Sequence, residues 1–333
     1  MKYFSLFSGV GGFEQAIINF YKKHNKHPTC IGFSEIDKFA ISVYTHHFPQ
    51  HKNYEDITKI NWKTVPDFDL LVGGSPCQDF SIAGKRAGII GKRSGLIWEY
   101  IRCLREKKPT NFIWENVKGV MSSRNGFDFG SILIAFSEVG YDCEWQVLNA
   151  NEFGIPQSRE RIFIVGHLRG KSRPKVFPIR TNYTPIIGTT KTRRKWNFNN
   201  TSKGRKQSQI QLCAHSSFKI KGEVRATNRI KIGEANTLTT GQGCGGRSNM
   251  TFIKDGMKIR RLTPLECERL MSWPDNWTAY GVAGKISDAQ RYKMCGNGVV
   301  STVVEAVVSR LFSNTKVDIK INDQPNYCRV RFW

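Results

Sequence analysis

The stretch KYFSLFSGVGGF (residues 2–13) decides the fold of this chain. It begins with an apolar run of strand length, continues into a loop that contains Gly9, Gly11 and Gly12, and enters a helical pattern near Phe13. A strand, a glycine loop and a helix in this order open many α/β domains that bind a nucleotide-like ligand at the loop. The spacing departs from G-x-G-x-x-G and the lysine of a phosphate-binding loop is missing, so the loop alone predicts either a ligand site or a tight turn.

The same alternation of strand and helix continues through the first half of the chain. Short apolar runs predict further strands, and longer stretches between them predict helices. The expected strands cover residues 29–34, 69–73, 111–114, 143–148 and 161–165, and the expected helices begin near Asp37 and cover residues 96–106 and 131–139. This order is typical of an α/β fold in which a mostly parallel, Rossmann-like sheet is covered by helices on both faces.

The composition excludes several other classes of protein. Hydrophobic residues make up 39% of the 333 residues, which is enough to bury a core and excludes a disordered chain. No apolar run approaches about 18 residues, and the first run is broken by Ser8 and Gly9, so we expect neither a membrane span nor a signal peptide. The nine cysteines form no C-x-x-C pair, which predicts no disulfide framework and no metal site. We therefore expect a cytoplasmic protein in a reducing compartment.

Positive charge is concentrated in one part of the chain. The net charge is +24, and the window from Arg169 to Lys231 holds 17 Lys or Arg residues against a single acid, Glu223, which leaves +16 within it. A block of this kind favours binding to a polyanion such as nucleic acid. The alternative is a solvated basic surface, and charge alone leaves it open.

The apolar rhythm ends after His167, which predicts a change of domain. Prolines, threonines, asparagines and basic residues follow. We therefore expect a first domain over residues 1–169, a second and smaller domain over residues 170–255, and a segment over residues 256–333 that returns to the first domain.

Two helices are predicted in the returning segment. The stretch RRLTPLECERLMSWPDNW (residues 260–277) has a helical pattern, with Thr263 as N-cap and Pro264 at the first helical position. The apolar stretch over residues 298–312 predicts a second helix, which would pack on the first domain.

Two acids follow predicted elements at positions where a nucleoside could bind. Glu35 comes directly after the strand at residues 29–34, where an acid can accept hydrogen bonds from ribose hydroxyls. Asp56 is expected at the next strand end, within reach of an adenine amino group. Each acid alone is more simply read as a loop carboxylate. Together with the glycine loop they favour an adenosine-type cofactor, either NAD or S-adenosylmethionine.

The stretch LLVGGSPCQDFS (residues 70–81) carries a candidate nucleophile. The predicted strand ends in a polar loop at the carboxyl edge of the sheet, where ligands of open α/β sheets bind. Pro76 restricts the backbone beside Cys77 and helps to hold the thiol outward. A cysteine in this place is a better candidate for a nucleophile than for an inert core residue.

Two more groups are expected at the same edge. The strand NFIW leads into Glu115, whose partly desolvated carboxylate should have a raised pKa and hold a proton. Gln157, Arg159 and Arg161 alternate in QSRERIFIV and therefore face one side of an extended strand. Two guanidinium groups on one face can bind a phosphate or a carbonyl oxygen. An ordinary charged strand face is the alternative.

These pieces together resemble the DNA (cytosine-5) methyltransferase family. The matching segments follow the family order over nearly the whole chain, except for about residues 170–235 and the last twenty. They read FSGVGGFE, SEID, EDIT, GGSPCQDFS, RSGL, ENV, QSRERIF, RRLTPLECERLMSWPDNW and GNGVV. The trio PCQ, ENV and Q-x-R-x-R is highly specific. The resemblance implies a class I methyltransferase fold, S-adenosylmethionine as cofactor and double-stranded DNA as substrate.

The resemblance also implies roles for individual residues. Cys77 would add to carbon 6 of a flipped-out cytosine, and Glu115 would contact the base. Arg159 and Arg161 would line the base pocket. The residues that would hold the cofactor are Phe7, Gly9, Gly11, Gly12, Glu35, Ile36, Asp56, Ile57, Pro76, Asn297 and Val299.

Three further features follow from the resemblance. Residues 170–255 correspond to the target recognition domain, and the stretch from Thr237 to Gly246 resembles a family loop near DNA. The glycine- and lysine-containing stretch from Ile82 to Gly95 is expected to be a mobile lid over the DNA. The chain departs from several relatives at Ser5, where they carry aspartate.

Other functions stay open at this point. The alternatives are a tRNA (cytosine-5) methyltransferase with the same core, a DNA-binding relative without activity, and a nicotinamide-dependent dehydrogenase. The distinct basic second domain favours DNA over tRNA, the intact Cys77, Glu115 and Arg161 favour an enzyme, and a dehydrogenase leaves PCQ unexplained. We expect a monomer that is either a solitary methylase or the modification enzyme of a restriction–modification system with a separate cognate endonuclease.

Overall fold

The computed structural model describes most of the chain. The described residues are 1–76, 95–172, 174–181, 210–215, 217–220, 223–226, 231–232, 235–240, 250–255 and 258–313, and only the backbone is described at 210–232 and 250–259. Among these residues no helix is long and apolar enough to cross a membrane.

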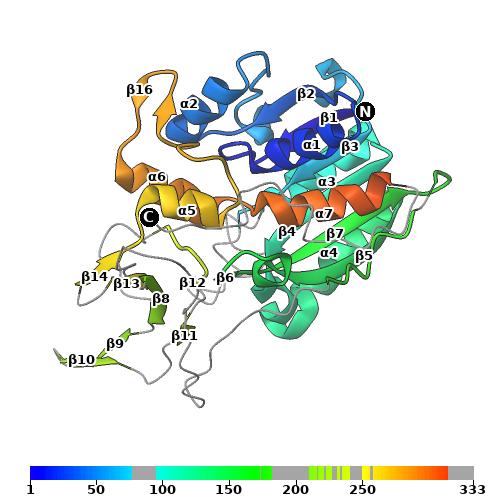
Figure 1. Cartoon of the computed structure of the whole chain (residues 1–333). Coiled ribbons are helices and arrows are strands. Elements are labelled where there is room, and N and C mark those ends of the chain that lie inside the picture. The colour runs from blue at the N-terminus through cyan, green and yellow to red at the C-terminus, as the bar shows by residue number, and fades with distance from the viewer. Residues whose placement is uncertain are drawn as a thin grey trace.

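A six-stranded sheet forms the centre of the protein (Figure 1). Its strands, in spatial order, are β2 (Thr29–Ser34), β1 (Lys2–Leu6), β3 (Leu70–Gly73), β4 (Asn111–Val117), β7 (Glu160–Leu168) and β5 (Tyr141–Asn149). The first four are parallel to one another, and β7 runs antiparallel to both of its neighbours. The prediction of a mostly parallel α/β sheet is confirmed, with one antiparallel strand that makes the sheet mixed.

Helices cover both faces of the sheet, as the alternation predicts. They are α1 (Gly12–Lys23), α2 (Lys38–His47), α3 (Leu96–Lys107), α4 (Phe127–Glu138) and α7 (Ser301–Phe312). Neighbouring residues of β1 point to opposite faces. Tyr3 therefore packs in one core with α1, α2 and α7, and Phe4 packs in a second core with α3 and α4. The carboxyl edge of the sheet is thus held rigidly between two apolar layers.

The returning segment differs from its prediction in three places. The helix predicted over residues 260–277 is only α5 (Pro264–Leu270), because the backbone turns at Ser272, whose φ is 59°. Its start is as predicted, since Thr263 and Glu266 form a capping box. The helix α6 (Asp288–Asn297) was not predicted. The last helix, α7, begins at Ser301 rather than at residue 298, and the Ser301 hydroxyl donates to the Gly12 carbonyl at 3.0 Å.

The remaining strands lie mostly outside the large sheet. They are β6 (Gln157–Ser158), β8 (Ile210–His215), β9 (Ser217–Ile220), β10 (Glu223–Ala226), β11 (Lys231–Ile232), β12 (Ala235–Asn236), β13 (Met250–Asp255), β14 (Lys258–Arg261), β15 (Tyr280–Gly281) and β16 (Gly284–Lys285). A four-stranded sheet has the order β11-β8-β13-β14 and lies below α5 in Figure 1, apart from the large sheet. The short 3₁₀ helices are η1 (Ile57–Lys59), η2 (Trp62–Thr64), η4 (Lys118–Gly126) and η5 (Ala150–Phe153).

The chain continues to pack on the first domain beyond the predicted limit at residue 169. Beyond residue 169, Val176, Phe177 and Ile179 are still buried in the core shared with α1 and α7. The backbone N–H groups of Val176 and Phe177 donate to the Glu144 carboxylate of β5, both at 2.9 Å. At the other limit, residue 255 is the last residue of β13 and pairs with Lys258 of β14.

A buried polar cluster lies beneath α1. Glu14 is fully buried and accepts a hydrogen bond from Tyr44 Oη at 3.0 Å, and the same hydroxyl lies 3.0 Å from His51 Nδ1. Burial raises the pKa of Glu14 to about 7, against smaller lowering effects of Ser5 and Tyr44. An aspartate at position 5 would bring a second carboxylate into this cluster, so the departure from the family pattern at Ser5 suits the presence of Glu14.

We predict that Glu14→Gln flattens the pH dependence of stability. The folded-state pKa of about 7 lies above the ordinary value of 4.5. Glu14 therefore contributes stability that is fully present below pH 4.5 and is lost as the pH rises through 7. Because glutamine does not titrate, the free energy of unfolding of the variant should rise relative to that of the wild type by about 3 kcal/mol between about pH 4.5 and pH 8. Urea unfolding at each pH measures this difference.

The control for this prediction is Glu106→Gln, on the exposed side of α3. It should keep the pH dependence of the wild type. A difference between Glu14→Gln and the wild type that stays constant over this pH range would contradict the prediction.

Candidate active site

Two side chains of β4 hold the loop after β3 in place by hydrogen bonds. Trp114 Nε1 donates to Ser75 Oγ at 3.2 Å, and Asn116 Nδ2 donates to the Ser75 carbonyl at 3.2 Å. Ser75 is buried as a result. The described part of the loop ends at Pro76, so the predicted nucleophile Cys77 lies outside the described residues, as does the predicted lid up to residue 94.

Gly74 brings this loop into direct contact with Glu115. A Cβ atom on Gly74 would lie 2.7 Å from Glu115 Oε2 and 2.9 Å from the Glu115 carbonyl oxygen. No side chain fits into that space, so glycine at position 74 allows the loop to lie against the carboxylate. The close approach places the segment that leads to Cys77 beside Glu115.

Glu115 forms an ion pair with Arg161 on the adjacent strand. Arg161 Nε lies 3.0 Å from Glu115 Oε1, and both side chains are 14% exposed. Arg161 is opposite Val117 in the antiparallel pair β4–β7, so Glu115 is its diagonal neighbour on the same face. Burial raises the pKa of Glu115, and the nearby guanidinium groups of Arg161 and Arg159 oppose part of that rise. The expectation of a desolvated carboxyl with a raised pKa is confirmed.

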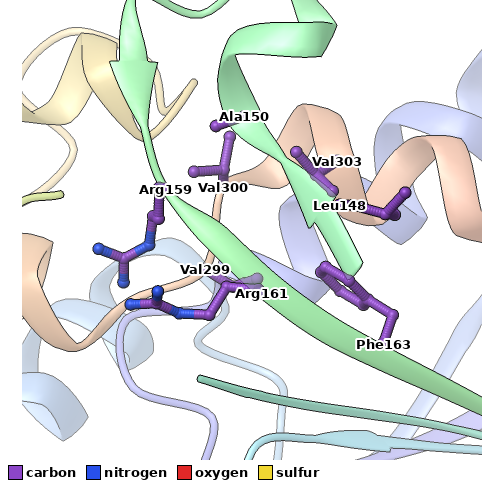
Figure 2. A pocket seen from close by; sticks show the side chains of 8 residues that line it. All are labelled: Leu148, Ala150, Arg159, Arg161, Phe163, Val299, Val300 and Val303. Atoms are coloured by element: carbon purple, nitrogen blue, oxygen red, sulfur yellow. The ribbon is translucent and has the colours of Figure 1, made fainter. Parts of the chain in front are cut away.

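Arg159 and Arg161 leave the chain on the same side, as the alternation predicts. Figure 2 shows both guanidinium groups pointing the same way from the rim of a small cavity whose other end is apolar. The apolar lining consists of Leu148, Ala150, Phe163, Val299, Val300 and Val303. The two arginines have different partners, however. Arg161 pairs with Glu115, whereas Arg159 is 3% exposed and donates to the carbonyl oxygens of Leu238, Gly296 and Gly298.

The loops after β1 and β2 meet at the same edge of the sheet. Phe7, Gly9 and Gly11 have positive φ values of 54°, 56° and 89°. Glu35 Oε2 accepts a hydrogen bond from the Gly9 N–H at 2.9 Å, and Oε1 accepts from Ile36 and Asp37 at 2.8 Å. The neighbouring Ile36 side chain is 71% exposed, which leaves an apolar surface beside the carboxylate.

Two of the predicted cofactor residues lie in a different setting from the one expected. Asp56 does not end a strand. It is the N-cap of η1, and its Oδ1 accepts hydrogen bonds from the Thr58 N–H at 3.0 Å and the Thr58 hydroxyl at 2.8 Å, which lower its pKa. The following Ile57 is buried in the core shared with α3 and α4.

Two more predicted cofactor residues, Asn297 and Val299, come from the returning segment. Asn297 is exposed at the end of α6, and Val299 packs against the start of α1. A Cβ atom on Gly12 would lie 2.9 Å from Val299 Cγ1 and 3.2 Å from the Val299 carbonyl oxygen. The structure therefore brings the first and last parts of the predicted cofactor site together.

Some residues that position the site carry no sequence signal of their own. Gly74 and Ser75 belong to the motif around Cys77, but their contacts with β4 depend on β3 and β4 being neighbours. Gln157 is fully buried and bonds backbone groups rather than a ligand, since its amide donates to the Leu270 carbonyl at 2.9 Å. Among the described residues no cluster of His, Cys, Asp or Glu could hold a metal ion.

Comparisons with known proteins point to one family. The family model for C-5 cytosine-specific DNA methylases matches residues 1–313. The orphan methyltransferase M.Rho11sI of Bacillus phage rho11s is 45% identical over 168 residues, which are 50% of this chain and only 33% of the relative's own length. The type II methyltransferase M.BsuFI of Bacillus subtilis is 33% identical over 317 residues, 93% of this chain and 72% of the relative.

A solved structure shows a similar fold. The methyltransferase EhMeth of Entamoeba histolytica superposes with a TM-score of 0.63 at 17% identity, over 94% of this chain and 98% of that one. At this identity the likeness concerns the fold alone.

We predict that Arg161→Gln raises the pKa of Glu115. The variant removes the cation that lies 3.0 Å from the carboxylate, and the lost attraction should raise the pKa by about 1 to 3 units. The measurement is a carboxyl ¹³C NMR titration of glutamate-labelled protein, in which Glu115→Gln identifies the resonance. Arg169→Gln, which breaks a more exposed pair with Asp142, is the control and should leave the resonance unchanged. An unchanged Glu115 titration in Arg161→Gln would rule out the ion pair as its cause.

Proposed function

Since the chain belongs to the C-5 cytosine-specific DNA methylase family, we propose that it transfers a methyl group to carbon 5 of cytosine in double-stranded DNA. One observation carries the proposal. The buried Glu115 carboxyl, with its raised pKa, is held between Arg161 and the loop that leads to the cysteine of the PCQ motif. A largely buried carboxyl next to a guanidinium offers two polar groups that suit recognition of a cytosine ring.

We propose S-adenosylmethionine as the cofactor, which would supply the methyl group on a positively charged sulfur. The residues at the edge of the sheet fit this group. The Glu35 carboxylate can accept about four hydrogen bonds, and three backbone N–H groups already donate to it. It can therefore accept one more from a ribose hydroxyl. The exposed Ile36 side chain offers an apolar surface for adenine. The full proposed set is Phe7, Gly9, Gly11, Gly12, Glu35, Ile36, Asp56, Ile57, Pro76, Asn297 and Val299.

We propose that Cys77 and Glu115 act on the same ring. The Cys77 thiolate forms a bond to carbon 6, and Glu115 donates a hydrogen bond or a proton to ring nitrogen 3, which offsets the negative charge that the added sulfur brings. Arg161 holds Glu115 in place and can donate to the carbonyl oxygen of the base. Carbon 5 thereby becomes nucleophilic enough to be methylated. A base then takes the carbon 5 proton, the electrons of the broken C–H bond re-form the double bond between carbons 5 and 6, and Cys77 leaves carbon 6 as a thiolate.

The basic part of the chain suits the DNA. A base inside a duplex cannot reach the pocket, so the target cytosine must be flipped out. We propose residues 170–255 as the target recognition domain. Its +16 charge between Arg169 and Lys231 would bind phosphates. We also propose that the enzyme acts as a monomer in the cytoplasm of a bacterial or phage-infected cell, alone or beside a restriction endonuclease.

The decisive experiment is bisulfite sequencing of DNA from bacterial cells that express the protein. Methylated cytosines in one sequence context are expected for the wild type, and none for Cys77→Ser, which should still bind the cofactor in calorimetry. A duplex with 5-fluorocytosine at the target should form a denaturation-resistant adduct with the wild type. Methylation of tRNA but not of duplex DNA would establish the alternative substrate. Normal turnover by Cys77→Ser would exclude the mechanism.

We predict that Gly74→Ala lowers kcat by about 100-fold or more, a loss comparable to that of one stabilising donor. The added methyl group must displace either the loop or the Glu115 carboxylate, from which it would lie 2.7 Å. The matched control is Gly130→Ala in α4, where a Cβ meets nothing within 4 Å and alanine should preserve activity. Equal kcat values for the two variants would show that the contact between Gly74 and Glu115 does not matter for turnover.

A further inference from the structure

Two segments that are far apart in the sequence meet at the short strand β6 and at Arg159, which follows it. The first, here called the threonine segment, covers residues 237–240 and follows β12. The second, here called the glycine segment, covers residues 296–298 and joins the end of α6 to Val299. The threonine segment is the described part of the stretch that resembles a family loop near DNA. The glycine segment belongs to the proposed cofactor site.

The threonine segment is bonded to the strand by side chains and backbone alike. Gln157 Oε1 accepts a hydrogen bond from the Leu238 N–H at 3.3 Å, and Arg159 Nη1 donates to the Leu238 carbonyl at 3.2 Å. The Thr237 hydroxyl donates to the Ser158 carbonyl at 2.5 Å. Just before it, β12 pairs with β6 in parallel. Both backbone polar groups of Leu238 are therefore held by the Gln157 and Arg159 side chains.

The same guanidinium group holds the glycine segment. Arg159 Nη2 donates to the carbonyl oxygens of Gly296 at 3.0 Å and Gly298 at 2.6 Å. The two segments also touch directly, because a Cβ atom on Gly296 would lie 2.5 Å from Thr239 C and from Thr240 N. One planar, buried cation thus fixes the distance between the two segments.

We propose that Arg159 is a positioning residue that couples cofactor binding to DNA binding, rather than a residue that contacts the base. A cofactor bound at Asn297 and Val299 orders the glycine segment, and Arg159 transmits that order to the threonine segment and to the small sheet beyond it. Arg161, whose guanidinium pairs with Glu115, remains the arginine proposed to contact the base. The inference rests on the proposed function, because it takes that function's cofactor and DNA as the two ligands.

The test measures a coupling factor. S-adenosylhomocysteine is titrated calorimetrically in the absence and in the presence of a saturating duplex that carries the sequence found by bisulfite mapping, or sheared genomic DNA if no sequence is found. The coupling factor is the ratio of the two Kd values. It should be about tenfold for the wild type, within the range usual for coupled sites. By reciprocity the duplex titrated with and without S-adenosylhomocysteine must give the same factor.

Arg159→Lys keeps the charge but cannot span three carbonyls with one planar group, so its coupling factor should fall to about 1–2 while each ligand alone still binds. Gly296→Ala should also lower the factor, because its methyl group would lie 2.5 Å from Thr239 C and Thr240 N and so push the two segments apart while Arg159 itself is unchanged. The control is Arg310→Lys, an arginine of α7 that donates to the Val176 carbonyl at 3.2 Å rather than to either segment. It should keep the wild-type factor.

The outcomes separate this proposal from the proposed function. A wild-type factor of 1, or a wild-type factor retained in Arg159→Lys, overturns the coupling role even if the enzyme methylates DNA. If Arg159→Lys does not fold, a retained factor in Gly296→Ala overturns it. Coupling that is present in the wild type and lost in the variants supports it, even if bisulfite sequencing shows no methylation and the proposed function fails.

Discussion

The contact between Gly74, Glu115 and Arg161 is the constraint on which the candidate site depends. Three strands contribute to it, since Gly74 follows β3, Glu115 lies on β4 and Arg161 lies on β7. Burying a charged carboxylate without a partner costs desolvation free energy, whereas a strong ion pair lowers the pKa of a carboxyl and favours loss of its proton. Burial raises the pKa of Glu115, and the guanidinium of Arg161 opposes part of that rise. The antiparallel β7 matters here, because it brings Arg161 to the diagonal position beside Glu115.

Much of the fold follows from local patterns, because strands and sheet-covering helices of an α/β domain carry strong periodicity. The glycine loop, the PCQ loop and the Q-x-R-x-R stretch can also be recognised in the sequence by their residue types. The segments that local patterns miss are held by polar contacts. Helix α6 has little apolar periodicity, and its Arg291 is buried only because it pairs with the buried Glu268 of α5 at 2.9 Å. Helix α5 ends early because Ser272 adopts a left-handed conformation that no residue-type rule requires.

The individual site residues show the same division. Glu115 lies within β4 rather than after it, because pairing with β7 extends the strand to Val117, beyond its predicted end at residue 114. Asp56 is not at a strand end, because an acid in a loop and an acid that caps a 3₁₀ turn look alike in sequence. Arg159 and Arg161 share a face, as alternation requires, yet they bind different partners. The partners of Arg159 lie about 80 and 140 residues further along the chain, whereas the partner of Arg161 lies on the neighbouring strand β4. Such partners become visible only when the chain is folded.

The packing of α7 on α1 has a consequence for how the protein is made. The valines of α7 complete the core over β1, and the Ser301 hydroxyl bonds the Gly12 carbonyl beside the glycine loop. A ribosome therefore releases β1 and α1 long before the helix that covers them exists. The nascent first strand must wait, exposed or shielded by a chaperone, while nearly three hundred further residues are translated. In a circular permutant whose chain started just before α7 and continued from there into β1, the ribosome would release α7 together with β1, and this delay would be absent.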